Sequence, residues 1–146
     1  MTNIIQFAIL LVMLFTMETD YALRIIRELG RGRGGRKTLD EICKNEQIPR
    51  HFSYKILKKL EKSGMVRIFR GVGGGYALAA DTGGITIFDV IASIDGDILL
   101  SECLGHRFDC SVKKRGKKIC GVHRELGRIQ SLLLGHLKEK PLAEIF

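Results

Sequence analysis

Three cysteines and a histidine near the C-terminal end of the chain have the residue types and spacing to bind a metal ion. Cys103, Cys110 and Cys120 are separated by six and nine residues, and His123 follows the last of them closely. Five lysines and arginines between residues 113 and 118 favour the thiolate form, which is the form that coordinates metals. Zinc held by the three thiolates and His123 is one interpretation, although zinc motifs usually contain cysteine pairs separated by only a few residues.

The rest of the chain must position these residues, and its length and charge limit what it can be. The 146 residues suit one domain, or one domain with an appended dimerisation element, and are too few for a large multidomain enzyme. The net charge is +8, and residues 24–70 hold 14 lysines and arginines against 5 aspartates and glutamates. This local excess of positive charge favours an anionic partner.

Three helices are predicted in the basic half of the chain. Apolar residues at helical spacing predict the first over residues 18–29, and a capping box at Thr38 opens the second over 38–45. A basic, glycine-rich loop over 30–37 should join them. The third helix, 49–63, begins at Pro49 and makes a helix-turn-helix with the second, unless its basic face is merely solvated. The candidate DNA-contacting residues on that face are Arg50, His51, Ser53, Tyr54, Lys55, Lys58 and Lys59.

A short β-hairpin is predicted directly after the third helix. Residues 65–70 and 76–79 have the composition of strands, and the glycine-rich segment 71–75 should form the turn between them. A phosphate-binding loop is excluded because such a loop opens into a helix, whereas this one opens into a strand. The hairpin is therefore a wing that can approach a DNA duplex closely and place a guanidinium in the minor groove. Its candidate DNA-contacting residues are Arg67, Arg70, Gly73 and Gly74.

The segment Thr19–Arg24, the helix-turn-helix and the wing Val66–Leu78 together resemble the Rrf-type family of winged helix-turn-helix transcriptional regulators, which includes IscR, NsrR and RirA. The arginine, glycine-rich turn and tyrosine of the wing are the most specific part of this resemblance. It implies a mainly α fold with a small β-hairpin wing, a palindromic double-stranded DNA operator and a homodimer. One position departs from the family pattern, since Pro49 stands where a serine usually caps the recognition helix.

Two further helices are predicted after the wing. The first begins at Thr86, and the second is a long C-terminal helix over about 123–138. Gly127, Ser131 and Gly135 form a stripe of small residues on the long helix, which favours close packing against another helix. The family resemblance implies that this is the dimerisation helix, and a contact within one chain is the alternative.

The resemblance also gives the cysteines a second interpretation, an iron–sulfur cluster of [2Fe-2S] or [4Fe-4S] type held by Cys103, Cys110 and Cys120. It offers two fourth ligands, His123 of the same chain or Asp20 of the partner subunit. Disulfides are the weaker explanation for a DNA-binding protein without an export signal, because the cytoplasm is reducing. Cys43 is predicted on the inner side of the second helix, as a buried thiol with no role in the cluster.

We therefore expect a cytoplasmic repressor, and not an enzyme, whose operator binding is controlled by a cluster that senses iron, redox state or nitric oxide. The alternatives are a small electron-transfer iron–sulfur protein and a winged-helix regulator that binds zinc or senses thiol chemistry. Residues 1–16 are expected to be an extension from a misassigned translation start, without a role in a membrane. Residues 17–80 would form the DNA-binding domain, and 81–146 the cluster-binding loop and dimerisation helices.

Overall fold

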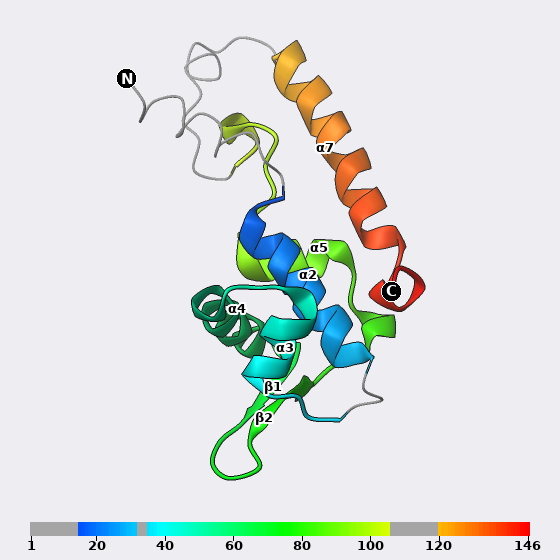
Figure 1. The fold of residues 1–146 in the computed structure, drawn as a ribbon. Coiled ribbons are helices and arrows are strands. Elements are labelled where there is room, and N and C mark those ends of the chain that lie inside the picture. The colour runs from blue at the N-terminus through cyan, green and yellow to red at the C-terminus, as the bar shows by residue number, and fades with distance from the viewer. Residues whose placement is uncertain (1–14, 32–34, 106–119) are drawn as a thin grey trace, which may run out of the picture.

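A computed structural model describes residues 15–31, 35–105 and 120–146 of the protein (Figure 1). Its helices are α2 (Met17–Gly30), α3 (Leu39–Glu46), α4 (Arg50–Lys62), α5 (Ile87–Ile94) and α7 (Gly121–Glu139). The two strands are β1 (Val66–Phe69) and β2 (Gly75–Leu78), and short 3₁₀ turns are formed by η1 (Thr82–Gly84), η2 (Glu102–Leu104) and η3 (Leu142–Glu144). The predicted fold class, mainly α with a β-hairpin wing and a long C-terminal helix, is confirmed.

The hydrophobic core is organised around α2, which packs against α3, α4 and α5 (Figure 1). Ile25, Ile26 and Leu29 of α2 are fully buried, and they belong to one cluster with apolar residues of α3, α4 and α5. Leu142, close to the C-terminus, is also fully buried in this cluster, and its amide donates to the carbonyl of Ile85 over 2.7 Å. The core of residues 17–80, predicted as the DNA-binding domain, therefore extends across residue 80 and includes Leu142.

Side-chain caps define where the helices begin. Thr38 and Thr86 both form capping boxes, with Glu41 and Asp89 as the reciprocal partners, and both threonines were predicted as helix starts. Thr16 caps α2 by accepting from the amide of Thr19, so it belongs to the fold rather than to an N-terminal extension ending at residue 16. Residues 1–14 of that predicted extension lie outside the described residues.

Helix α4, the predicted recognition helix, begins one residue later than predicted. Pro49 is the N-cap rather than the first helical residue, with φ −59° and ψ 134°. It offers no side-chain cap, but its carbonyl accepts from the amides of Phe52 and Ser53, each at 3.1 Å. The serine cap that the family pattern would supply is therefore replaced by an extended backbone that proline can adopt.

The wing is an antiparallel hairpin in which Val66 is paired with Leu78 and Phe69 with Gly75. Lys37 adds a further bridge, because its amide and carbonyl both bond to Tyr76 of β2. A Cβ at Gly75, where φ is +145°, would lie 2.8 Å from the Lys37 carbonyl oxygen, so only glycine fits there. The predicted loop 30–37 therefore ends in a β-bridge at Lys37, which joins the wing to the helices.

Two buried carboxylates join α2 to α3, and one of them also binds Lys37 of this bridge. Glu28 of α2 is 2% exposed, and it accepts from Lys37 at 2.6 Å and from Asn45 of α3 at 2.7 Å. Glu46, at the end of α3, is 5% exposed and paired with Arg27 of α2. Burial of a charged group is tolerated only with such partners, so α2, α3 and the base of the wing are held together as one unit.

The long helix α7 runs beside the rest of the molecule rather than through its core (Figure 1). It starts at Gly121 and ends at Glu139, close to the predicted 123–138. None of its residues is buried in the described structure, and Val122, Ile129 and Leu132 are 67%, 42% and 54% exposed. Among the described residues, no helix is long and apolar enough to cross a membrane.

Candidate DNA-binding surface and metal-binding segment

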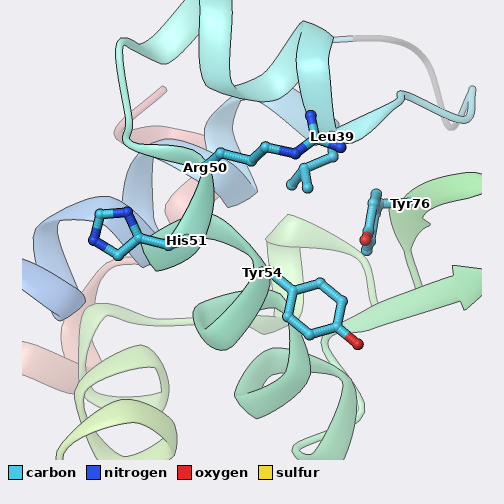
Figure 2. Close-up of a pocket in the computed structure, with 5 residues that line it drawn as sticks. All are labelled: Leu39, Arg50, His51, Tyr54 and Tyr76. Carbon is cyan, nitrogen blue, oxygen red and sulfur yellow. The ribbon is translucent and has the colours of Figure 1, made fainter.

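A hollow of about 620 Å³ lies between the helix-turn-helix and the wing, where a DNA duplex would approach a winged helix. In Figure 2 the Arg50 side chain extends across it toward Leu39 and Tyr76, whereas His51 points to the other side of α4. The lining thus combines a guanidinium and aromatic hydroxyls with apolar side chains, which suits both phosphates and base edges. The residues that line it are Leu39, Arg50, His51, Tyr54 and Tyr76.

Two residues of this hollow have their chemistry adjusted by neighbours. The pKa of Tyr76 is raised, mainly by burial and to a smaller extent by the nearby Tyr54, whereas the positive charge of Arg50 acts in the opposite direction. The Tyr76 hydroxyl therefore remains a hydrogen-bond donor at neutral pH. Arg50 forms an ion pair with Asp40 of α3, and both side chains are well exposed. Contact of Arg50 with a phosphate requires that this surface pair open, which costs little.

Ser53 does not belong to the exposed basic face, and its prediction as a DNA contact was wrong. Ser53 is fully buried, and its hydroxyl donates to the Pro49 carbonyl at 3.3 Å. The same hydroxyl lies 3.3 Å from the sulfur of Cys43, which is partly buried between α3 and α4. Cys43 is therefore a packing residue of the helix-turn-helix, on the inner side of α3 as predicted.

The lysines of α4 differ in how they are paired. Lys58 is close to Glu61 of its own helix at 3.7 Å, with both side chains well exposed. Lys55 and Lys59 instead bind the two oxygens of Glu18 in α2, each at 2.6 Å. Hydrogen bonds from Lys55 and then Lys59 lower the pKa of Glu18, so this carboxylate stays ionised. Lys59 is one-third exposed and is the least accessible of the three.

The wing presents its predicted residues to solvent. Arg67 and Arg70 are exposed, and neither forms an ion pair with another described residue. Gly73 is exposed and Gly74 partly so, and Val72 between Gly71 and Gly73 is fully exposed at the tip. Arg36, in the basic loop before the bridge, was not among the predicted DNA-contacting residues of the wing. Its guanidinium stacks 3.7 Å above the Phe69 ring and donates to the Gly73 carbonyl, which adds a cation to the wing surface.

The predicted metal ligands are only partly placed by the structure. Cys103 lies in η2 and Cys120 at the N-cap of α7, and both are partly buried thiols outside any disulfide with a described cysteine. His123 is exposed in the first turn of α7. Cys110 lies outside the described residues. Among residues 15–31, 35–105 and 120–146, no three potential ligands come together as a metal site.

The segments that carry Cys103 and Cys120 are nevertheless in contact. The amide of Leu100 donates to the Gln130 side chain of α7 at 2.9 Å. Leu104, next to Cys103, lies 3.8 Å from the position that a Cβ on Gly127 would occupy. Asp20, the other candidate ligand, is half-exposed at the start of α2 and ion-paired with Arg24 at 2.8 Å. Thiolate, imidazole and carboxylate are donor types that fit a metal cluster. The cysteine segment, residues 103–120, begins beside α7 and ends at its N-cap.

Comparison with known proteins decides the family. The Rrf2 family model, described as an iron-dependent transcriptional regulator, matches residues 15–146. The chain belongs to the Rrf2 family. Among curated Rrf2-like relatives, the HTH-type transcriptional regulator IscR of Vibrio atlanticus is 31% identical over 73% of this chain and 59% of its own length. IscR of Citrobacter koseri is 27% identical over 91% of this chain and 79% of its own length.

Solved structures have the same fold as this Rrf2 chain. IscR of T. potens has a TM-score of 0.63 at 22% identity, covering 90% of this chain and 84% of its own. CymR, the global cysteine regulator of B. subtilis, also has a TM-score of 0.63, at 23% identity, covering 90% of this chain and 94% of its own. The protein is a DNA-binding transcriptional regulator of the Rrf2 family with a winged helix.

Proposed function

We propose that this Rrf2 regulator is a homodimeric repressor whose affinity for a palindromic operator is controlled by an iron–sulfur cluster. The observation that carries this proposal is the position of the cysteines. Cys103 and Cys120 are unbridged thiols that flank the segment holding Cys110, and they adjoin α7 in a chain with a basic winged helix. The IscR names of its relatives and the iron-dependent description of the family model support the same interpretation.

Dimerisation through α7 is supported by the apolar side chains that this helix leaves uncovered. Ile129 and Leu132 are about half exposed, and a second copy of the helix would bury them. The small residues Gly127, Ser131 and Gly135 allow two helices to approach closely. A dimer would present two α4 helices to successive major grooves, roughly 34 Å apart, as a palindromic site requires.

Cys103, Cys110 and Cys120 would hold the cluster, which when bound supplies iron and sulfide that react with oxidants or nitric oxide. This chain would convert a change at those thiolates into a change in geometry. Cys103 adjoins Leu104, which packs over Gly127, and Cys120 caps the start of α7. A shift of either thiolate would therefore move α7, and with it the spacing of the two recognition helices.

The fourth ligand has two candidates with different consequences. His123 is in the first turn of α7, one helical turn after Cys120, so its use would keep the cluster within one subunit. Asp20 of the partner subunit would instead join the cluster to the winged helix of that subunit. To bind the cluster, the Asp20 carboxylate would have to leave its ion pair with Arg24. We favour Asp20, because this arrangement connects the cluster directly to the winged helix.

Anaerobic purification followed by visible absorption and iron and sulfide analysis tests the proposal. Alanine at Cys103, Cys110 or Cys120 should abolish the colour, and Cys43→Ala should retain it because Cys43 packs against Ser53 in the helix-turn-helix. His123→Ala should bleach the protein if His123 is the ligand, whereas Asp20→Ala should change both spectrum and DNA affinity if Asp20 is. A colourless wild-type protein without iron or sulfide would contradict the proposal.

Thiol sensing without a metal is the second candidate, because Cys103 and Cys120 are unbridged and partly accessible. The solved structures of similar fold include CymR of Staphylococcus aureus and an oxidised form of it. This alternative predicts that peroxide changes the operator affinity of iron-free protein, and that a reductant restores the original affinity. The cluster proposal predicts that the response depends on iron content.

A further inference from the structure

Glu18, in the first turn of α2, lies opposite two lysines of the recognition helix. Its two carboxylate oxygens accept separately from Lys55 and Lys59, each at 2.6 Å. The Glu18 side chain is 20% exposed, compared with 60% for Lys55 and 33% for Lys59. One carboxylate therefore bridges α2 and α4 and satisfies two cations at the same time.

The end of α5 also contacts this group of charged residues. The Lys59 ammonium also donates to the carbonyl of Ile94, the last residue of α5, at 3.0 Å. Asp95, the next residue, accepts from the hydroxyls of Thr16 and Thr19, the latter at 2.6 Å. These contacts hold the start of α2, the middle of α4 and the end of α5 together, and from here the chain continues to Cys103.

Carboxylate and phosphate compete for the same ammonium groups. A lysine that binds Glu18 must leave it, or share it, before it can neutralise a phosphate of DNA. Each phosphate neutralised by a cation steepens the salt dependence of binding by about 0.9 in log–log slope. The pairing of Lys58 with Glu61 is longer, at 3.7 Å, and stays within one exposed helix surface, so it restrains its lysine much less.

We propose that Glu18 is a positioning residue that withholds Lys55 and Lys59 from DNA phosphates, and that Asp95 sets how firmly it does so. The part played by Asp95 rests on the proposed function, since Asp95 begins the segment that leads to Cys103. While Glu18 binds both Lys55 and Lys59, α4 offers fewer cations to DNA. When a change in the cysteine segment displaces Asp95, α2 loses its anchor and Lys55 and Lys59 become available.

The test compares Glu18→Gln with Glu61→Gln in cluster-free protein. Both variants remove one negative charge next to lysines of α4, so general electrostatic attraction to DNA rises equally. The probe is a fluorescent duplex selected by the wild-type protein from a random-sequence pool, titrated at several salt concentrations. Glu18→Gln should bind about 5- to 10-fold more tightly than Glu61→Gln, with a salt slope steeper by about one to two.

Equal affinity and equal salt slope for the two variants, or weaker binding by Glu18→Gln, would overturn the proposal. A double variant, Glu18→Gln with Lys55→Met, should lose part of the gain. If Glu18→Gln lowers stability too far, Glu18→Asp is compared with Glu61→Asp instead, because both variants keep the negative charge and only shorten the side chain that pairs with the lysines. Failure of the wild-type protein to select any duplex would instead refute DNA binding itself.

Asp95→Asn tests the connection to the cysteine segment. It should raise the affinity of cluster-free protein in the same direction as Glu18→Gln, and the two substitutions together should give no more than the larger single effect. Fully additive effects would show that Asp95 and Glu18 act independently, and would overturn this part of the proposal while leaving the restraint by Glu18 in place.

Discussion

Replacement of Glu28 by glutamine should destabilise the DNA-binding domain and loosen its wing. The Glu28 carboxylate accepts from Lys37 at 2.6 Å, Asn45 at 2.7 Å and Arg31 at 3.4 Å, and it is nearly inaccessible to solvent. A glutamine of the same size keeps one acceptor oxygen, which Lys37 and Asn45 can still share because both donate to the same oxygen of Glu28. It turns an amide donor toward the Arg31 guanidinium, however, and leaves the Lys37 ammonium without a charged partner. Because a hydrogen bond to a charged group contributes about 1.5–3 kcal/mol to stability, we expect the free energy of unfolding to fall by about 2–3 kcal/mol.

The pH dependence of this loss follows from the pKa of Glu28. Burial alone would raise that pKa, but the hydrogen bonds from Lys37 and Asn45 outweigh burial and lower it. A group with a lowered pKa in the folded state stabilises the protein above its unfolded pKa, and this contribution disappears as the pH falls. The difference between wild type and Glu28→Gln should therefore be complete at neutral pH and shrink below about pH 4.

Urea unfolding of both proteins at several pH values measures this difference. A loss of this size corresponds to a fall in melting temperature of about 5–10 °C for a chain of this length. Glu125→Gln is the matched control, because Glu125 forms a similar pair with Arg128 on the exposed surface of α7 and should leave unfolding unchanged. Equal stability of Glu28→Gln and wild type at neutral pH, or a difference that persists unchanged in acid, would show that the Glu28 carboxylate does not stabilise the fold through its charge.

Three further substitutions test the wing, the C-terminal anchor and the DNA-binding surface. Gly75→Ala places a Cβ 2.8 Å from the Lys37 carbonyl at a φ of +145°, and it should cost about 1–3 kcal/mol in urea unfolding and weaken DNA binding. Leu142→Ala should lower the free energy of unfolding by about 2–5 kcal/mol, because this side chain is fully buried in the core. In fluorescence titrations, Arg70→Ala should weaken binding and relax a preference for A·T pairs, whereas Ser53→Ala should not change base preference, because Ser53 is buried.

Local features of the fold were predictable from the sequence. Thr38 and Thr86 stand three residues before Glu41 and Asp89, and both pairs form the capping boxes that this spacing predicts. The wing was predictable because alternating strand-forming residues surround a run of glycines. In each case the cause lies within a few residues of the chain, where sequence patterns carry the most information.

Contacts between distant segments were not predictable in this way. The bridge between Lys37 and Tyr76 joins residues far apart in sequence, and nothing near Lys37 indicates a strand partner. The Glu18 contacts with Lys55 and Lys59 also depend on how α2 crosses α4. Ser53 was assigned to the exposed face by its polarity, although its spacing from Ile56, Leu57 and Leu60 already indicated the buried side of α4.

Paired operator titrations of one anaerobic preparation, before and after removal of its cluster, test whether the cluster controls DNA binding. The duplex is selected from a random-sequence pool by the protein as purified, and iron and sulfide are measured on the same samples. The affinity should change at least about tenfold with iron content, a typical size for coupling between two sites. The same treatment of Cys103→Ala should produce no change. An unchanged affinity for the wild-type protein, with its cluster demonstrably lost, would contradict control of DNA binding by the cluster.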